Sequence, residues 1–365
     1  MKYNLYKSTK GLTLIEIIVM IIILGILSTT VLVKYTDFSN AAKKGVEDGV
    51  VGAIRGGINM LYAKNQSYPA QLDSASDGEA TPANPFFGVV LTQAITKEWS
   101  KNGAFYKAPS NRSYCYNPTT GKFIYSSSLG LMDGTVAIWS MQEGTGNTAN
   151  NTLVQCSPTA PQIFQGNLVG AAWNNIGGRQ GLHFDGNHYV APNVTDYVSV
   201  PNSASLNLTD KGTVSTWIYM DTTPGAWAGI LHKGTATNFS DEAYSMQFYN
   251  GKLSFGFNND LSSYLVTNTT LNPGQWYQIT ATWDNNAGPD KGTKIYVNGE
   301  LVASDPTKSR TARISSGDLI IGAQLDKSYS PSYKNLGFNG SITDVGLFNR
   351  ALTAAEIQSY YNSTK

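Results

Sequence analysis

The chain of 365 residues has little charge, few histidines and only two cysteines. Charged residues make up 14% of it and the formal net charge is +1, so no strong electrostatic field draws it to a polyanion. We therefore expect no nucleic-acid partner. The three histidines, His183, His188 and His232, are too scattered to define a transition-metal site. We also expect no organic cofactor.

The two cysteines, Cys115 and Cys156, are the simplest candidates for a disulfide bond. In an oxidising compartment they would pair, and closing a loop of this size stabilises a fold by roughly 4 kcal/mol in the chain-entropy description. Two unpaired thiols are the alternative. Metal binding is disfavoured because neither a CxxC spacing nor a nearby histidine supplies further ligands.

The length is sufficient for two domains, because single cores rarely grow far beyond about 250 residues. Glycine (36 residues) and tyrosine (21 residues) are abundant, and Asn, Ser and Thr are frequent in the second half. This composition is typical of short strands joined by tight turns at an extracellular surface. It predicts an all-β outer region.

The amino-terminal part contains a hydrophobic run, LTLIEIIVMIIILGILSTTVLV over residues 12–33, which is long enough to span a bilayer as a helix. Lys2, Lys7 and Lys10 precede it, so positive charge is expected to hold that end in the cytoplasm and to place everything after about residue 36 outside. Glu16 lies within the run, where a carboxylate needs a partner and therefore a role. A plain membrane anchor is the alternative.

The segment KGLTLIE over residues 10–16 resembles the class III signal of type IV prepilins and pseudopilins. The resemblance implies that a membrane-embedded prepilin peptidase cuts between Gly11 and Leu12 and N-methylates Leu12. It also implies that Glu16 neutralises the new α-amino group of a neighbouring subunit inside a filament. Many pilins have Phe and Pro where this chain has Leu12 and Val33.

A helix is expected to continue from residue 12 to about residue 64. Its buried stripe is predicted to be Val46, Val50, Ile54, Ile58 and Leu61, at steps of four and three. The turn cluster KNQSYPAQLD should end it between Tyr62 and Asn65. This region resembles pilins of the mannose-sensitive haemagglutinin type. Two short strands around Pro118–Gly121 should complete a small α+β head over residues 65–130.

From about Gly134 the hydrophobic period becomes two, as in VSTWIYM and WYQITATWD. The pattern predicts an antiparallel β-sandwich of about a dozen strands. Alternation places Trp283 and Tyr277 on one face of their strand and Trp276 on the other. A carboxyl-terminal helix is expected after Thr353, with Thr353 and Glu356 forming a capping box.

The segments GLHFDG, GTVSTWIYM and FNGSITDVGLFNRALTAAEI resemble the laminin-G-like jelly rolls of the concanavalin A-like lectin/glucanase fold. We therefore expect a multidomain chain: a leader over residues 1–11, a pilin domain over 12–130 with a long helix and a small head, and an all-β sandwich over 131–365. The resemblance implies a structural Ca²⁺ held by Asp185 and Asp344. The alternative is that these are a turn-forming and a solvated aspartate.

Ligand binding and catalysis are less clearly marked. Trp227, in the loop-like PGAWAG, is our candidate for an exposed ligand-binding platform. The one close acidic pair, Asp241 and Glu242, would point to opposite faces of an extended segment. Glycoside hydrolysis needs two carboxylates on either side of one bond. We therefore predict no catalytic residues and no enzymatic activity.

Together these observations predict a structural subunit of a type IV pilus that displays a lectin-like sandwich for adhesion. Expected partners are copies of itself and other pilins in a helical filament, the prepilin peptidase, the inner-membrane assembly platform, and a glycan or protein surface ligand. The expected location is the inner membrane before assembly and the extracellular pilus afterwards. A pseudopilin of a type II secretion system is the second hypothesis, and a filament-tethered polysaccharide-acting enzyme is the third.

Overall fold

The structure is a computed structural model, and its chain divides into two compact units, Met1–Gly52 and Ala53–Lys365. The residues that it describes are 42–102, 105–110, 112–126, 134–152, 164–186, 196–225, 227–235, 241–286, 288, 291–308, 310–324 and 336–365. The predicted processing and assembly residues Gly11, Leu12 and Glu16 lie outside these ranges, as does Cys156.

The amino-terminal helix is described from residue 42 to residue 65, so its end agrees with the prediction. Within the described residues, no helix combines the length and the apolar character needed to cross a membrane. The hydrophobic run over residues 12–33 precedes the described part of the chain.

The predicted stripe on this helix was partly wrong. Val46 is 68% exposed, whereas Val51, Ile54 and Ile58 are buried together with Glu47. Steps of four residues drift about 40° each around a helix of 3.6 residues per turn, so a stripe extended backwards from Ile54 to Val46 leaves the buried face. The spacing of 47, 51, 54 and 58 stays on one face.

The head contains one antiparallel five-stranded sheet in the order β1-β2-β3-β4-β5. These strands are β1 (Gly78–Glu79), β2 (Ser100–Asn102), β3 (Phe105–Lys107), β4 (Ser113–Asn117) and β5 (Lys122–Ser126). The predicted turn between β4 and β5 is confirmed: Asn117 Oδ1 accepts hydrogen bonds from the backbone N–H of Thr119 (2.9 Å) and Thr120 (3.1 Å). Gly121 follows with φ of 68°, a conformation that favours glycine.

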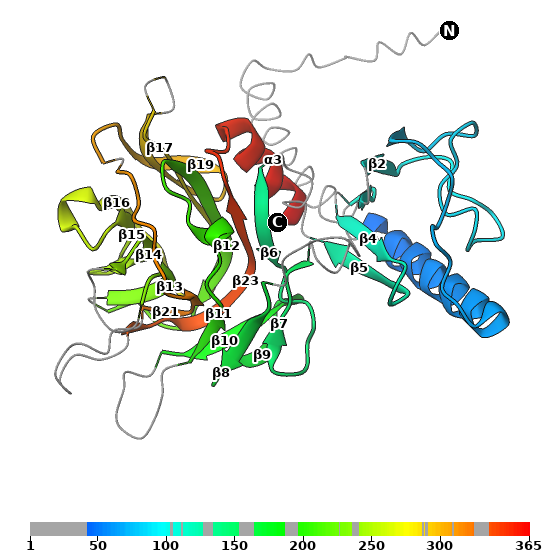
Figure 1. The fold of residues 1–365 in the computed structure, drawn as a ribbon, viewed down its shortest axis with the longest axis horizontal. Coiled ribbons are helices and arrows are strands. Elements are labelled where there is room, and N and C mark those ends of the chain that lie inside the picture. The colour runs from blue at the N-terminus through cyan, green and yellow to red at the C-terminus, as the bar shows by residue number, and fades with distance from the viewer. Residues whose placement is uncertain are drawn as a thin grey trace, which may run out of the picture. The chain divides into compact units, whose positions relative to one another are not determined.

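The following region is a β-sandwich of two antiparallel eight-stranded sheets (Figure 1). We call the first the helix-side sheet, with the order β19-β18-β17-β12-β23-β10-β9 and β6 paired to β23. Its strands are β6 (Thr135–Trp139), β9 (Ala172–Ile176), β10 (Arg179–Asp185), β12 (Lys211–Met220), β17 (Trp276–Asp284), β18 (Gly292–Val297), β19 (Glu300–Asp305) and β23 (Asn339–Phe348).

The second sheet, which we call the opposite sheet, has the order β16-β15-β14-β13-β20-β11-β8-β7. Its strands are β7 (Thr148–Ala149), β8 (Gly166–Val169), β11 (Tyr197–Val200), β13 (Trp227–Lys233), β14 (Tyr244–Tyr249), β15 (Lys252–Phe257), β16 (Leu265–Thr270) and β20 (Leu319–Ile321). A short pair, β21 (Ala323–Gln324) and β22 (Leu336–Gly337), and two 3-10 turns, Ala204–Leu206 and Leu261–Ser263, complete the described elements.

The main core lies between the two sheets. Trp283 from β17 is fully buried, and its ring centroid lies 5.6 Å from that of Tyr244 and 5.2 Å from that of Phe255. The predicted alternation of β17 is confirmed, because Trp283 and Tyr277 join this core whereas Trp276 packs against a separate cluster on the outer face.

The carboxyl-terminal helix α3 (Ala354–Thr364) covers that outer face of the helix-side sheet (Figure 1). Ile357 and Tyr360 of α3 pack against Trp217 of β12 in this separate cluster. The predicted capping box is confirmed: the Thr353 hydroxyl accepts from the Glu356 backbone N–H, and the Glu356 carboxylate accepts from that of Thr353.

Candidate functional site

The outer face of the opposite sheet carries buried polar side chains. In β14 the side chains of Tyr244, Met246 and Phe248 enter the main core, so Ser245 and Gln247 between them point to the other side. Ser254 in β15 does the same. We call this group the polar face, and it consists of seven buried residues: His232, Glu242, Ser245, Gln247, Ser254, Tyr264 and Gln324.

Glu242 is the centre of the polar face. One carboxylate oxygen accepts from the Tyr264 hydroxyl at 2.8 Å and from the Asn259 backbone N–H at 3.1 Å. The other accepts from Gln324 Nε2 at 3.2 Å and lies 3.5 Å from His232 Nδ1. Several donors therefore converge on one buried carboxylate, which is how proteins retain a charge away from water.

Tyr264 is held in place by the sheet beneath it. A Cβ at Gly256 would lie 2.5 Å from the Tyr264 ring, so only glycine in β15 leaves room for that ring. Burial, together with the Glu242 carboxylate, raises the pKa of Tyr264 well above its ordinary value. The phenol therefore stays protonated and acts as a donor to Glu242.

Trp227 begins β13 at one end of the polar face. Trp227 pairs with Tyr249, and Gly229 pairs with Gln247, so the two aromatic residues stand on the same face of the sheet as Gln247, two residues away. Their ring centroids are 4.4 Å apart, and both side chains are half-buried. The aromatic platform predicted at Trp227 is thus half covered by Tyr249, and its role in binding remains a prediction.

The polar face brings a carboxylate, an imidazole, amides and hydroxyls together beside an aromatic pair. Such groups hydrogen-bond to and stack against polar ligands, including sugars. Sequence reasoning missed most of these residues. The signal was present in YSMQFY and KLSFGF, where Ser and Gln alternate with core residues.

Asp241 and Glu242 diverge, as expected for adjacent residues. Asp241 accepts a hydrogen bond from the Ser315 hydroxyl at 3.1 Å, whereas Glu242 belongs to the polar face.

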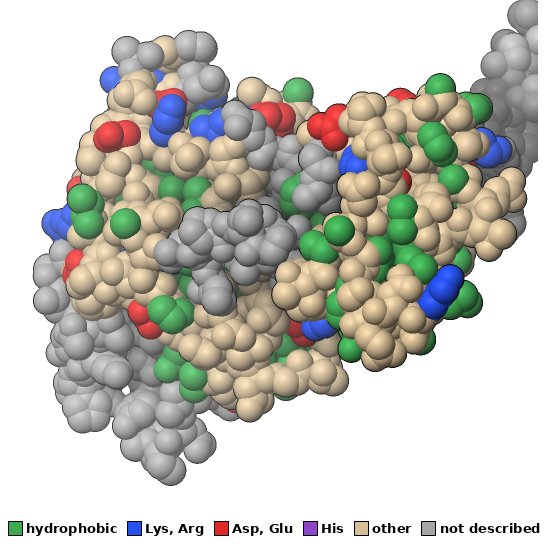
Figure 2. Space-filling model, turned by 45° about the vertical axis from the view of Figure 1, so that its right-hand side comes forward, with side chains coloured by type: hydrophobic (Ala, Val, Ile, Leu, Met, Phe, Trp, Pro, Cys, Tyr) green, Lys and Arg blue, Asp and Glu red, His purple; other side chains and the backbone are tan. Residues whose placement is uncertain are grey.

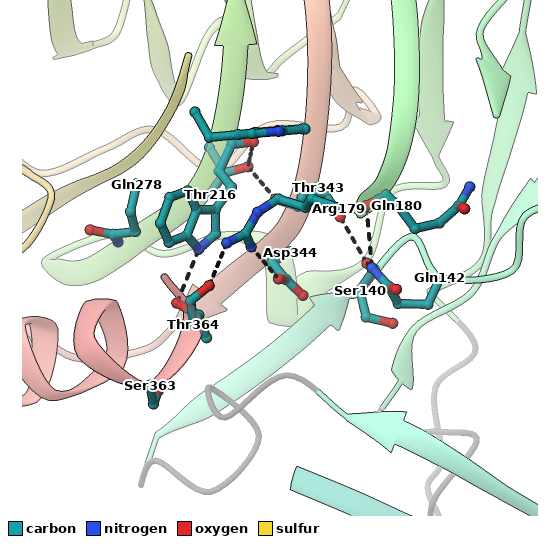
Figure 3. A network of polar contacts seen from close by, with 12 residues as sticks. Ser140, Gln142, Arg179, Gln180, Thr216, Gln278, Thr343, Asp344, Ser363 and Thr364 are labelled. Carbon is teal, nitrogen blue, oxygen red and sulfur yellow. Dashed lines mark hydrogen bonds and ion pairs between the residues drawn. The ribbon is translucent and has the colours of Figure 1, made fainter. Parts of the chain in front are cut away.

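A second polar group lies on the outer face of the helix-side sheet, under α3 (Figure 3). The guanidinium of Arg179 stacks 3.9 Å from the centroid of the Trp217 ring and donates a hydrogen bond to the Thr364 carbonyl at the end of α3. Asp344 Oδ2 lies 3.8 Å from Arg179 Nη1. A cation that binds the last carbonyls of a helix stabilises that end.

Asp344 occupies an unusual position in β23. It is 2% exposed and has φ of +51°, near a register shift between β12 and β23. Burial raises its pKa to about 7, while the Arg179 charge acts in the opposite direction. The Thr343 hydroxyl beside it donates to the Ser140 carbonyl at 3.0 Å, as Figure 3 shows. Arg179 and Asp344 therefore fasten α3 to the sheet.

The predicted calcium ligands are not brought together. Asp185 pairs with Asn339 at one end of β23, and Asp344 lies five residues further along, roughly 17 Å away at the rise of an extended strand. The guanidinium of Arg179 beside Asp344 also opposes a second cation there. Among the described residues, no group of three or more His, Cys, Asp or Glu side chains is arranged to hold a metal ion. These two residues do not fit one Ca²⁺ site.

Cys115 is fully buried in β4 and is disulfide-bonded. Its predicted partner, Cys156, is outside the described residues.

Residues 192–358 match the family described as the concanavalin A-like lectin/glucanases superfamily (Laminin_G_3). Among curated proteins, human adhesion G-protein coupled receptor D1 is 34% identical over 90 residues, which are 24% of this chain and 9% of the receptor. Jeltraxin of Lepidobatrachus laevis is 30% identical over 89 residues, which are 24% of this chain and 38% of jeltraxin. The chain thus spans only a minor part of either relative.

A third relative is the type II secretion system core protein G of Pseudomonas aeruginosa. It is 31% identical over 103 residues, which are 28% of this chain and 67% of the core protein.

Solved structures with a similar fold include domain 4 of the GH43 extracellular arabinanase of Geobacillus stearothermophilus, with a TM-score of 0.43 and 14% identity over 62% of this chain and 98% of that domain. Trypanosoma rangeli sialidase has a TM-score of 0.45 and 15% identity over 64% of this chain and 33% of the sialidase. At such identities the likeness concerns the fold alone.

These neighbours correct the prediction that the chain is not an enzyme. They include a domain of an arabinanase and a sialidase, and a β-sandwich fold neither excludes enzymatic activity nor assigns it. The adjacency of Asp241 and Glu242 was not sufficient evidence to exclude enzymatic activity. Residues 192–358 therefore form a laminin-G-like domain of the concanavalin A-like lectin/glucanase superfamily, and over 103 residues the chain is similar to a type II secretion system core protein.

Proposed function

We propose that the chain is a subunit of a type IV pilus-like filament that carries its laminin-G-like domain outside the cell to recognise a surface ligand. The observation that carries the proposal is the joining, in one chain, of a segment related to a secretion core protein and a domain of a lectin-like superfamily. The first supplies assembly and the second supplies recognition.

Assembly depends on the amino-terminal residues. Cleavage between Gly11 and Leu12 frees an α-amino group, and Glu16 of a neighbouring copy neutralises it within apolar surroundings. The partners in this step are the prepilin peptidase, the inner-membrane assembly platform, copies of this chain and other pilins.

Recognition is assigned to the half-buried Trp227–Tyr249 pair, which lies at one end of the buried polar face. Figure 2 shows that Lys/Arg and Asp/Glu side chains are sparse and intermixed on the face drawn there. Charged residues make up only 14% of the chain, so hydrogen-bonding and aromatic groups are the main resource for binding, and they suit a glycan or a polar protein segment.

The assembly proposal is tested on filaments sheared from cells and analysed by mass spectrometry. We expect the mature chain in the filaments to begin at N-methylated Leu12. We also expect the Glu16→Leu variant to be processed but absent from filaments. An unprocessed leader in exported material, or normal incorporation of Glu16→Leu, would contradict the proposal.

The recognition proposal is tested with the full-length chain in detergent on a glycan array and on host-cell surface proteins. We expect Trp227→Ala and Tyr249→Ala to reduce binding of the same ligand at least tenfold. Leu301→Ala is the control, because Leu301 is 53% exposed in β19 of the other sheet. Equal loss in all three variants, or no loss in the first two, would overturn the assignment of binding to the Trp227–Tyr249 pair.

A second function is favoured by the similarity to core protein G: a pseudopilin of a type II secretion system. Deletion of the gene separates the two hypotheses. Loss of secreted proteins with normal surface pili and adhesion would support the pseudopilin, whereas loss of pili or adhesion with normal secretion would support the pilus subunit.

A further inference from the structure

Lys233, at the end of β13, is a fully buried lysine in the sandwich. Its ammonium nitrogen donates to Asn202 Oδ1 at 2.8 Å, to the Ser315 carbonyl at 3.2 Å and to the Gly317 carbonyl. Three oxygen acceptors therefore surround the three N–H bonds of one ammonium group, which satisfies every donor that it has.

Three chain segments meet at this ammonium. Asp318 Oδ1 accepts from the Asn202 backbone N–H at 3.0 Å, and the Asp318 carbonyl accepts from the Gly234 N–H at 3.3 Å. A Cβ at Gly317 would lie 2.0 Å from the carbonyl carbon of Gly234, so these two backbones touch directly. The oxygens are thus held by the fold and do not depend on flexible side chains alone.

Negative charge lies close by. The carboxylates of Asp241 and Asp318 both favour the protonated form of Lys233, while burial acts more strongly and lowers its pKa to about 8. Asp241 is itself fixed by the Ser315 hydroxyl at 3.1 Å. Backbone carbonyls, an amide oxygen and nearby carboxylates are the donor types that proteins use for hard cations.

We propose that residues 202, 315 and 317, with Asp241 and Asp318 nearby, form a cation site that the chain's own Lys233 ammonium occupies. The site takes a small primary ammonium or a Ca²⁺ ion when the lysine side chain is removed. This inference is independent of the proposed function. It explains how the segment carrying Asp241, and next to it Glu242 of the polar face, is held in place.

The test uses Lys233→Ala in the full-length chain purified in detergent, followed by thermal unfolding. Removing one partner of a buried charged group commonly costs several kcal/mol, so we expect the Tm to fall by about 10 °C. Propylammonium supplies the three deleted methylene groups that carry the nitrogen, together with the charge. We expect it at tens of millimolar, or Ca²⁺ at millimolar concentration, to restore at least half of the lost Tm.

Two controls separate a cation site from a filled cavity. Propanol has nearly the same volume as propylammonium but no charge, and it should not raise the Tm of Lys233→Ala. Lys252→Ala removes a half-buried lysine that donates to the Asn268 carbonyl at 2.7 Å, and neither propylammonium nor Ca²⁺ should change the Tm of this variant. Equal rescue by propanol, or no rescue by either cation, would overturn the proposal.

A second measurement serves if Lys233→Ala fails to fold. Amine acylation of the unmodified protein at pH 8.5, followed by peptide mass spectrometry, should label Lys252 at least 100-fold faster than Lys233. Comparable labelling of the two lysines would show that the Lys233 nitrogen is not enclosed, and the cation site would be rejected.

Discussion

The two sheets of the sandwich share one core but use their outer faces differently. On the helix-side sheet the outward Trp217, Tyr296 and Phe348 pack against α3, beside the buried polar group of Ser215, Gln278 and Thr280. On the opposite sheet the outward Ser245, Gln247 and Ser254 are polar. The same two-residue period therefore combines apolar helix contacts with polar contacts on one outer face, and places hydrogen-bonded polar side chains on the other.

The largest effect is expected where α3 meets the sheet. Trp217→Ala removes the ring beneath Arg179 and the apolar contact with α3, and we expect it to lower the free energy of unfolding by about 4 kcal/mol. Chemical denaturation followed by tryptophan fluorescence measures this. Trp276→Ala, at a half-buried neighbouring position, should cost clearly less. Equal costs would mean that α3 docking does not depend on Trp217.

The substitution Asp344→Asn is expected to have the next largest effect on stability. The pKa of Asp344 is raised from 3.8 to about 7, so the folded state binds a proton more tightly than the unfolded state. Stability is therefore lost as pH rises from about 4 to about 7, and the cost of the buried charge persists above pH 7. Asn carries no charge, so we expect the variant to exceed the unmodified protein in stability by about 2 kcal/mol at pH 8.

The gain from Asp344→Asn should become small near pH 4, where the carboxyl group is protonated in the folded state and partly protonated in the unfolded state. Unfolding curves from pH 4 to pH 8 provide the measurement. A stability difference that stays constant across this range would show that Asp344 does not titrate there and that Arg179 holds it ionised.

The sequence predicted the strands of the sandwich and the helix α3 better than it predicted which outer face α3 covers. The period of two in β12 and β17 was sufficient to predict a sandwich, and Thr353 with Glu356 was sufficient to place α3. The strand period and the capping box depend only on residues close together in the sequence. Which outward face a helix covers depends on contacts between distant segments, such as Arg179 with Thr364, and no local pattern reveals them.

The same reason explains the site. The hydrogen bond that Tyr264 donates to Glu242 spans a hairpin, and Lys233 reaches oxygens more than 80 residues away at Ser315 and Gly317. The calcium prediction failed for a related reason. Asp185 and Asp344 lie on the paired strands β10 and β23, but Asp185 pairs with Asn339, five residues before Asp344. Register sets that position, and the sequence alone did not supply it.

Glu356→Ala should have a smaller effect. It removes the carboxylate that accepts from the Thr353 backbone N–H and that pairs with Arg350, whereas the Thr353 hydroxyl still accepts from the backbone N–H of residue 356. We expect a loss of about 1 kcal/mol at pH 7. Arg350 and Thr353 lower the pKa of Glu356 to about 2, so its contribution is present above pH 4.5 and is lost as pH falls toward 2. Glu300→Ala in β19, an exposed position, is the control. A loss at pH 7 no larger than that of the control would mean that the cap is not needed to dock α3.

The smallest effect is expected on the polar face. Ser245→Ala removes a hydroxyl that lies 3.0 Å from the Tyr264 hydroxyl, and Tyr264 keeps its hydrogen bond to Glu242. We therefore expect a loss of about 0.5 kcal/mol in unfolding free energy, measured beside Trp217→Ala under the same conditions. Ser254→Ala, which removes a hydrogen bond to the Gln247 carbonyl, should behave alike. A loss approaching that of Trp217→Ala would mean that the polar face stabilises the sandwich as much as the α3 contact does, and the contrast between the two outer faces would fail.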